Sequence, residues 1–272
     1  KHSGFYMSIS NIFDQLWSQY IETNPNVARI HNLFTEQGEH VKNDHIALRT
    51  FNDPRVNIDK VSAVLRKFGY EEQGEYHFEK KNLYAKHFAH PTEDLPKVFI
   101  SELLLENFSK NLQFAVKNMI DSIPVETINS DEFIVSGRLW GDVSFKQYEA
   151  LREESEYAAW VYVFGYCANH FTVSIDELKK FDTIESVNAF IEANGFEMNS
   201  VGGKVKGSPE VYLEQSSTLA NPIEISFEDG VHSIPSVFYE FATRYKMENG
   251  TLFEGFIADN ADKIFESTNF VK

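Results

Sequence analysis

The first forty residues place their apolar side chains at helical spacing. Apolar residues recur every three or four positions within residues 8–40, which puts them on one face of a helix. They form two series separated by Asn24-Pro25, and a proline interrupts a helix because it lacks the backbone N–H. We therefore predict two N-terminal helices within residues 8–40. Their apolar faces consist of Ile12, Leu16 and Tyr20, then Val27, Ile30 and Phe34.

The pattern then changes to strict alternation. In the segment NDHIALRTF, the apolar Ile46 and Leu48 fall on one face of a strand. His45, Ala47 and Arg49 fall on the other face. We therefore predict a strand that packs on a core with one side and presents an imidazole and a guanidinium with the other.

A second segment, ANHFTVSI, repeats this pattern, with His170 at the start of the strand and on the polar face. Each of the two strands is followed by a turn, an amphipathic helix and a glycine that precedes an aromatic residue. Gly69 and Gly195 lie at nearly the same distance from His45 and His170, respectively. Such internal repetition predicts two copies of one supersecondary unit.

Each copy continues with three strand-like segments, so the repeated unit is βαβββ. We predict an α+β fold in which two tandem βαβββ modules form one curved mixed sheet around a metal site. The chain would be a single domain, residues 1–272, with modules at 41–105 and 161–272 and a helical insert at 106–160. The second module would end in a C-terminal closing helix. The strand-like segments are 71–80, 83–90 and 97–105, then 196–204, 210–218 and 236–245.

Composition and charge narrow the function. The formal net charge of −16 leaves no surplus of Lys and Arg for a nucleic-acid backbone, so we expect no nucleic-acid partner. A small anion needs only one or two local cations and remains compatible with this charge. No apolar run approaches the roughly 18 residues of a membrane span, so we expect no membrane partner. The single cysteine, Cys167, excludes an intrachain disulfide and suits a reducing compartment, which predicts a cytoplasmic protein.

The repeat gives the two strand histidines a possible shared role. If the copies pack about a pseudo-twofold axis, His45 and His170 meet near that axis, together with a carboxylate from a last strand. Glu102 and Glu240 occupy the two last strands and count as equivalent, so spacing alone does not choose between them. Two histidines and one carboxylate form the facial triad of non-haem Fe(II) enzymes. For either histidine taken alone, the alternative is a structural role.

Five segments together resemble the 2-oxoadipate dioxygenase/decarboxylase family of the vicinal oxygen chelate superfamily: DHIALRTF, SEYAAWV, ANHFTVSI, YEFATRY and ADKIFEST. The resemblance covers nearly the whole chain. It implies that His45, His170 and Glu240 bind the metal. It also implies that Arg49 binds a substrate carboxylate and is a catalytic residue, although pairing of Arg49 with a local acid is the alternative. Glu102 remains an extra ligand, a partner of the arginine, or an exposed residue.

The reaction implied by the resemblance is the oxidative decarboxylation of a 2-oxo acid. Fe(II) is the implied cofactor and O2 the co-substrate, while a purified preparation can carry Zn or Ni instead. For 2-oxoadipate the products would be 2-hydroxyglutarate and CO2. Weaker candidates for substrate contact are Gln215, on a strand, and Lys204 or Lys206, in a glycine-rich loop. His87 and Phe256 are further candidates around the pocket, with core packing as the alternative.

Two other functions fit the same scaffold. A Zn- or Ni-dependent isomerase or hydrolase of the glyoxalase type often uses four protein ligands, so it would draw Glu102 into the metal site. A non-catalytic module that binds a small anion would not require His45 and His170 to lie close together. The position of these residues therefore distinguishes the three hypotheses.

Overall fold

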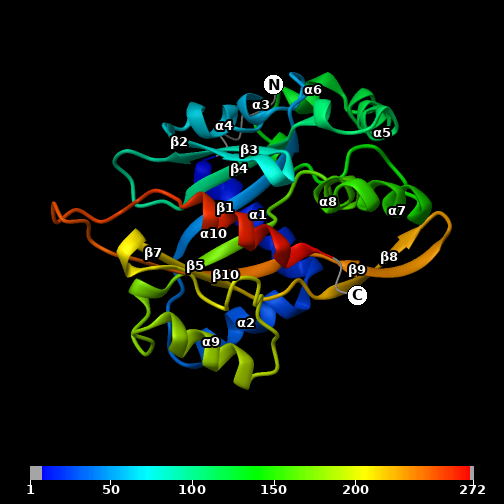
Figure 1. Ribbon diagram of the computed structural model, residues 1–272. Helices are drawn as coiled ribbons and strands as arrows, with labels where there is room; N and C mark the ends of the chain where they lie inside the picture. Colours follow the sequence, from blue (N-terminus) through cyan, green and yellow to red (C-terminus); the bar gives the residue numbers. More distant parts are fainter. Residues whose placement is uncertain (1–7, 270–272) are drawn as a thin grey trace, which may run out of the picture.

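Eight strands form one mixed sheet through the centre of the molecule in a computed structural model that describes residues 8–269 (Figure 1). The strand order is β2-β3-β4-β1-β5-β10-β7-β6. The first four strands are β1 (Asn43–Phe51), β2 (Glu71–Phe78), β3 (Leu83–Ala89) and β4 (Lys97–Leu103). The other four are β5 (His170–Ser174), β6 (Lys206–Ser208), β7 (Leu213–Ser217) and β10 (Phe238–Arg244).

Each half of the sheet is one βαβββ module. In the first module, β1 is followed by α3 (Ile58–Val61) and α4 (Ala63–Lys67) before the remaining strands. In the second module, β5 is followed by α9 (Ile184–Ala193). In both modules the first strand lies beside the fourth and the second strand lies at the edge. The predicted α+β fold with two such modules is therefore confirmed.

The modules are related by a pseudo-twofold axis between β1 and β5, which pair in antiparallel fashion. Ile46 lies opposite Phe171, His45 opposite Thr172, and Ala47 opposite His170. His45 therefore has the same position relative to β5 as His170 has relative to β1. The axis passes through the Ile46–Phe171 pair, and it places the two histidines as symmetry mates one step away from it.

The second module departs from the predicted strands in two places. Residues 196–204 do not form a strand, apart from a single bridge between Met198 and Thr218. Gly202 and Gly203 have φ values of +69° and +98°, which break an extended run. An additional hairpin, β8 (Pro222–Phe227) and β9 (Gly230–Pro235), forms a separate two-stranded sheet between β7 and β10 in the chain. This hairpin was not predicted from the sequence.

Helices form where the apolar spacing predicts them at the N-terminus. Asn24 separates α1 from α2, and Ser8 caps α1 by accepting a hydrogen bond from the backbone N–H of Asn11. The insert contains helices up to residue 164, and Ser155 ends α7 and caps α8. The helices not yet described are α1 (Ile9–Thr23), α2 (Pro25–Glu36), α5 (Lys110–Asp121), α6 (Val125–Ile128), α7 (Phe145–Glu154), α8 (Glu156–Phe164) and α10 (Ala258–Ile264). Short 3-10 turns are η1 (Glu79–Lys81), η2 (Leu105–Asn107), η3 (Phe133–Val135), η4 (Ile175–Glu177), η5 (Pro209–Val211) and η6 (Phe265–Thr268).

The two faces of the sheet have different environments. On one face, Trp17 and Tyr20 of α1 pack against Phe171, each with a ring-centroid distance of 5.0 Å. Because side chains alternate along a strand, the neighbouring His170 points to the opposite face. Helix α10 runs across that opposite face (Figure 1), where Ile264 and the adjoining Phe265 line a cavity. Within residues 8–269, no helix is long and apolar enough to cross a bilayer.

Candidate metal centre

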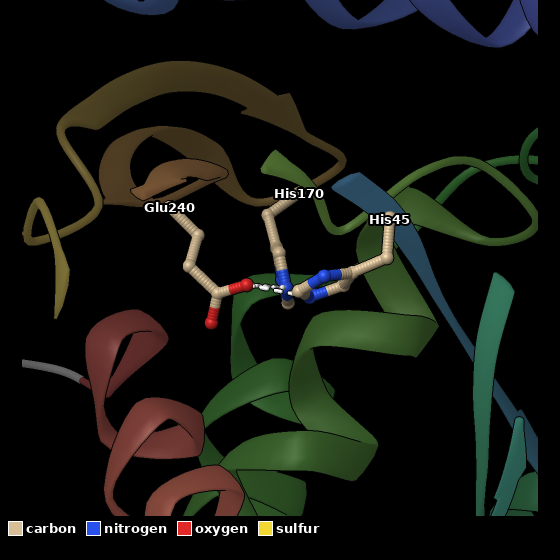
Figure 2. A group of neighbouring side chains, drawn as sticks. All are labelled: His45, His170 and Glu240. Atoms are coloured by element: carbon tan, nitrogen blue, oxygen red, sulfur yellow. Dashed lines mark ion pairs between the residues drawn. The ribbon is translucent and has the colours of Figure 1, made fainter. Parts of the chain in front are cut away.

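Three side chains from three neighbouring strands converge on one face of the sheet (Figure 2). His45 on β1, His170 on β5 and Glu240 on β10 are buried, with 2%, 7% and 1% of their surface exposed. Glu240 Oε2 lies 2.5 Å from His45 Nε2 and 3.5 Å from His170 Nε2. One candidate ligand atom from each residue lies within 4.8 Å of the others. The structure therefore brings together the three residues that the family resemblance implied as metal ligands.

Thr172 links two members of this group. It lies opposite His45 in the antiparallel pair of β1 and β5, and beside Glu240 in the parallel pair of β5 and β10. Its hydroxyl oxygen is 3.0 Å from His45 Nε2 and donates a hydrogen bond to Glu240 Oε2 at 2.5 Å. Sheet register thus fixes Glu240 against the histidines. The sequence pattern assigns no role to Thr172, although Thr172 shares the polar face of its strand with His170.

The residue preceding each histidine fixes the orientation of its ring. Asp44 Oδ2 lies 2.7 Å from His45 Nδ1, and Asn169 Oδ1 lies 2.9 Å from His170 Nδ1. An acceptor on Nδ1 directs Nε2 toward the centre as the free nitrogen, which is the arrangement of metal-binding histidines. Arg244 in turn holds Asp44, donating from Nε to Oδ1 at 2.8 Å and from Nη2 to Oδ2 at 3.1 Å.

Electrostatics keep the carboxylates of this group ionised. Burial alone would raise the pKa of Glu240, but His45 and His170 outweigh it, and the net shift is downward. Burial likewise opposes ionisation of Asp44, yet Arg244 and His45 hold the pKa of Asp44 below its ordinary value. Burial lowers the pKa of His170, which favours its neutral, ligating form. Two imidazole nitrogens and one carboxylate in a buried site are a donor set that suits a divalent transition metal, so these residues fit such an ion.

Arg49 lies in the same cavity without an acidic partner. It is 4% exposed, and its Nη2 donates to Thr268 Oγ1 at 3.0 Å. Three aromatic rings, those of Tyr157, Trp160 and Phe265, lie 4.8 to 5.7 Å from its guanidinium carbon. Within residues 8–269 no carboxylate forms an ion pair with it.

Burial lowers the pKa of Arg49 to about 10, which still leaves it charged at neutral pH. The alternative that Arg49 pairs with Glu102 or Glu240 is therefore wrong for the described residues. A buried cation without a counter-ion is costly, so the cavity is suited to an anionic ligand.

The cavity itself is mainly apolar. Its walls come from both modules and from the C-terminal helix, and the three converging side chains line it. The lining residues are His45, Ala47, Leu48, Arg49, Phe99, Ser101, Asn169, His170, Gln215, Phe238, Glu240, Phe256, Ala261, Ile264 and Phe265.

Glu102 does not belong to this site, and its predicted equivalence with Glu240 is wrong. Glu240 pairs with Thr172, which corresponds to Ala47, and Ala47 pairs with Phe99. The counterpart of Glu240 is therefore Phe99. Glu102 lies three residues further along β4, on the opposite face, where its Oε2 accepts from the backbone N–H of Ile58 at the start of α3 at 3.0 Å. Burial raises the pKa of Glu102 there.

Gln215 lines the cavity and also holds Glu240. Its Nε2 donates to Glu240 Oε1 at 3.1 Å, and its Oε1 accepts from Asn260 Nδ2 at 3.2 Å. Glu240 therefore presents Oε2 to the histidines while Gln215 engages Oε1. No signal in the sequence points to Asn260, which lies on α10 and has no counterpart in the repeat.

Of the remaining candidates for substrate contact, only Phe256 lines the cavity. Lys204 pairs with Glu192 at 2.8 Å on the surface, so its ammonium does not line the cavity. Lys206 is buried, but it donates to the backbone carbonyls of residues 199, 201 and 203, which fixes their loop. His87 contacts the Tyr76 hydroxyl at 2.8 Å, and burial lowers the pKa of His87 to about 4. Phe256 does line the cavity, with its ring centroid 4.8 Å from that of His45.

The fold and this site place the chain among α+β proteins of the vicinal oxygen chelate type. A profile of the 2-oxoadipate dioxygenase/decarboxylase family matches residues 5–250. The chloroplastic/amyloplastic 2-oxoadipate dioxygenase/decarboxylase of Oryza sativa is 36% identical over 275 residues, which cover 92% of this chain and 76% of the rice protein. The chain therefore belongs to this family of dioxygenase/decarboxylase enzymes.

Solved structures support the same conclusion. Hydroxyglutarate synthase from Oryza sativa, crystallised with 2-oxoadipate, superposes with a TM-score of 0.89 at 35% identity, covering 95% of this chain and 91% of that one. A protein from Shewanella frigidimarina, provisionally named a hydrolase, superposes with a TM-score of 0.87 at 50% identity. That match covers 94% of this chain and all of the other.

Proposed function

We propose that this enzyme is a non-haem Fe(II) dioxygenase that converts 2-oxoadipate, or a closely similar 2-oxo acid, to a 2-hydroxy acid and CO2. The observation that carries the proposal is a buried His-His-Glu group beside a buried arginine that lacks an acidic partner. For 2-oxoadipate and O2 the products are 2-hydroxyglutarate and CO2, which balances all atoms. The rice relatives, named for this substrate and this product, support the choice of substrate.

His45, His170 and Glu240 would hold the iron. Three protein ligands leave open positions on an octahedral ion, and the bound Fe(II) would supply the capacity to bind and reduce O2. The protein's own part is to keep Glu240 ionised and to orient both imidazole rings so that each Nε2 faces the ion. Asp44 and Asn169 contribute by accepting hydrogen bonds at Nδ1.

Arg49 would bind a carboxylate of the substrate. Its guanidinium offers parallel N–H donors, and a carboxylate matches this geometry in bidentate fashion. The three aromatic rings around it restrict its movement, so that the bound acid is oriented. The apolar lining from Phe99, Phe238 and Phe256 limits the access of water to the reacting centre.

Two alternatives lose support from the geometry. The glyoxalase-type isomerase or hydrolase with four protein ligands expects Glu102 beside the metal, and Glu102 instead caps α3. The non-catalytic binding module does not explain why two histidines and a glutamate converge in a buried cavity. Location in the cytoplasm stays a prediction, since the rice relative is named as chloroplastic/amyloplastic.

An oxygen electrode tests the proposal. Protein reconstituted anaerobically with Fe(II) is mixed with a panel of 2-oxo acids of different length, beside a His170→Ala control. We expect O2 uptake with 2-oxoadipate, one CO2 released per O2, and no uptake by the control. Absence of uptake with every acid, despite iron bound at one equivalent, would refute the proposal.

A further inference from the structure

The side-chain amide of Asn169, which lines the cavity, has a hydrogen-bond partner for its oxygen but none among the described residues for its nitrogen. Asn169 is 2% exposed and lines the cavity. Its backbone N–H donates to the carbonyl of Ala47 at 2.8 Å, and its Oδ1 lies 2.9 Å from His170 Nδ1. Its Nδ2 makes no hydrogen bond to any residue within 8–269. The side-chain amide therefore carries a donor that the protein leaves without a partner.

The orientation of this amide is set by His170. When Nε2 of His170 serves as a ligand, Nδ1 carries the proton and needs an acceptor. Rotating the amide by half a turn would place an N–H group against that N–H. Asn169 therefore keeps Oδ1 on the histidine, and its Nδ2 cannot exchange places to find a partner.

The repeat shows that an amide is not needed to support the histidine. Asp44 is the counterpart of Asn169, and its carboxylate orients His45 in the same way at 2.7 Å. Both carboxylate oxygens of Asp44 are also engaged by Arg244. A carboxylate at position 169 could thus also accept from His170 Nδ1, although Asp44 has Arg244 as a counter-ion in addition. What an asparagine adds at this position is an N–H donor beside the cavity.

A second donor in the same cavity points to the kind of ligand. Arg49 also lines it and has no carboxylate partner among the described residues. An unpaired buried donor is costly until an acceptor arrives. A neutral N–H donor without an acceptor and a guanidinium without a counter-ion fit a ligand that brings several acceptor oxygens and a negative charge on one small group, which is the chemistry of a carboxylate beside a keto group.

We propose that Asn169 is a substrate-binding residue, whose Nδ2 donates a hydrogen bond to an oxygen of the 2-oxo acid while Arg49 binds its carboxylate. This inference rests on the proposed function and deepens it. Asn169 then has two tasks, because Oδ1 orients a metal ligand and Nδ2 selects an oxygen-rich anion. The two tasks separate experimentally through substitutions that remove one or both.

The test uses Zn(II), which does not react with O2, as a stand-in for iron. The affinities for Zn(II), and then for 2-oxoadipate in the Zn(II)-loaded protein, are measured by calorimetry for wild type, Asn169→Asp and Asn169→Ala. The aspartate keeps the acceptor for His170 but replaces the donor with an oxygen that repels the substrate. The alanine removes acceptor and donor without adding repulsion.

The two affinities should rank the variants differently. We expect Asn169→Asp to bind Zn(II) at least as tightly as wild type and 2-oxoadipate at least tenfold more weakly. Asn169→Ala should bind Zn(II) more weakly than either, and its affinity for 2-oxoadipate should lie between those of wild type and Asn169→Asp. The same Asn→Asp change at Asn118, exposed on α5, controls for the added charge and should change neither affinity.

Each failure has its own meaning. If Asn169→Asp binds 2-oxoadipate as tightly as wild type, Asn169 only orients His170 and the inference is wrong. If Asn169→Asp does not fold, the inference fails when Asn169→Ala binds 2-oxoadipate as tightly as wild type. If wild type loaded with Zn(II) binds no 2-oxoadipate and the iron form takes up no O2, the proposed function itself is wrong.

Discussion

Glu240 of β10 and Phe99 of β4 occupy equivalent positions in the two modules. Glu240 pairs with Thr172 on β5, and Phe99 pairs with Ala47 on β1, the counterpart of Thr172. Two symmetric modules could provide four ligands, two histidines and two carboxylates. Here an aromatic ring replaces the fourth, so the donor set has three members. This asymmetry favours a metal with open positions for substrate and O2 over a site closed by protein ligands.

Replacing Phe99 with glutamate should restore the missing ligand. We expect Phe99→Glu to bind Zn(II) more tightly than wild type, because the second carboxylate completes a four-ligand site. Without metal the buried carboxylate has no partner and should cost about 2 kcal/mol of stability or more. Calorimetric Zn(II) titration and thermal unfolding with and without metal measure both effects. Zn(II) affinity equal to or below that of wild type would show that Phe99 does not face the metal position.

Removing the amide of Gln215 should loosen Glu240. Gln215→Leu keeps an apolar side chain of similar size but loses the hydrogen bond to Glu240 Oε1. Partners behind a metal ligand typically contribute 10- to 100-fold to affinity, and we expect a loss of about this size. Competition with a chromophoric chelator gives the Zn(II) affinity. Asn260→Ala should act in the same direction, because Asn260 orients Gln215; unchanged affinity in both variants would contradict this role.

Lysine should replace Arg49 poorly. Arg49→Lys keeps the positive charge but cannot make two parallel hydrogen bonds or stack between Tyr157, Trp160 and Phe265. A charge-assisted hydrogen bond contributes about 1.5–3 kcal/mol, so 2-oxoadipate should bind the Zn(II)-loaded variant at least tenfold more weakly. The Zn(II) affinity should not change. Equal binding of substrate would show that any cation suffices at this position.

Metal binding should stabilise the fold through His170. A ligand at 100 times its dissociation constant adds about 2.7 kcal/mol to the free energy of unfolding. For a chain of this size that amounts to a rise in Tm of about 5 °C or more. The rise should occur with Zn(II) in wild type and be absent in His170→Ala. A similar rise in the variant would place the bound metal elsewhere.

The spacing of residues was sufficient to predict the module repeat and the meeting of His45 and His170, whereas only the family resemblance selected Glu240 over Glu102. The histidines occupy equivalent positions in two segments of similar length. This equivalence can be recognised from the sequence alone, without knowing which residues are in contact. Glu102 was misassigned because the register of a parallel strand pair depends on the lengths of turns and helices between the strands. One pattern of apolar residues fits several registers, whereas the fold selects only one.

Other features depend on contacts between distant segments. The link from Asn260 through Gln215 to Glu240 joins α10 to β7 and β10, and no local pattern predicts it. The segment 196–204 begins with an apolar residue and was predicted as a strand. Gly202 and Gly203 have positive φ values, which are incompatible with an extended strand. The unpartnered donor of Asn169 is visible only when the partners of every buried polar atom are known. The only signal in the sequence was that Asn169 precedes His170 as Asp44 precedes His45, which indicates that both support the following histidine.

Isotope labelling tests the central claim most directly. Wild type with Fe(II) and 2-oxoadipate is incubated under 18O2, and the 2-hydroxy acid and CO2 are analysed by mass spectrometry. An oxygenase that cleaves the bond to the substrate carboxyl and hydroxylates the remainder places both atoms of O2 in 2-hydroxyglutarate and none in the CO2. That is the result we predict. A product without 18O, or one formed equally well without O2, would contradict the account.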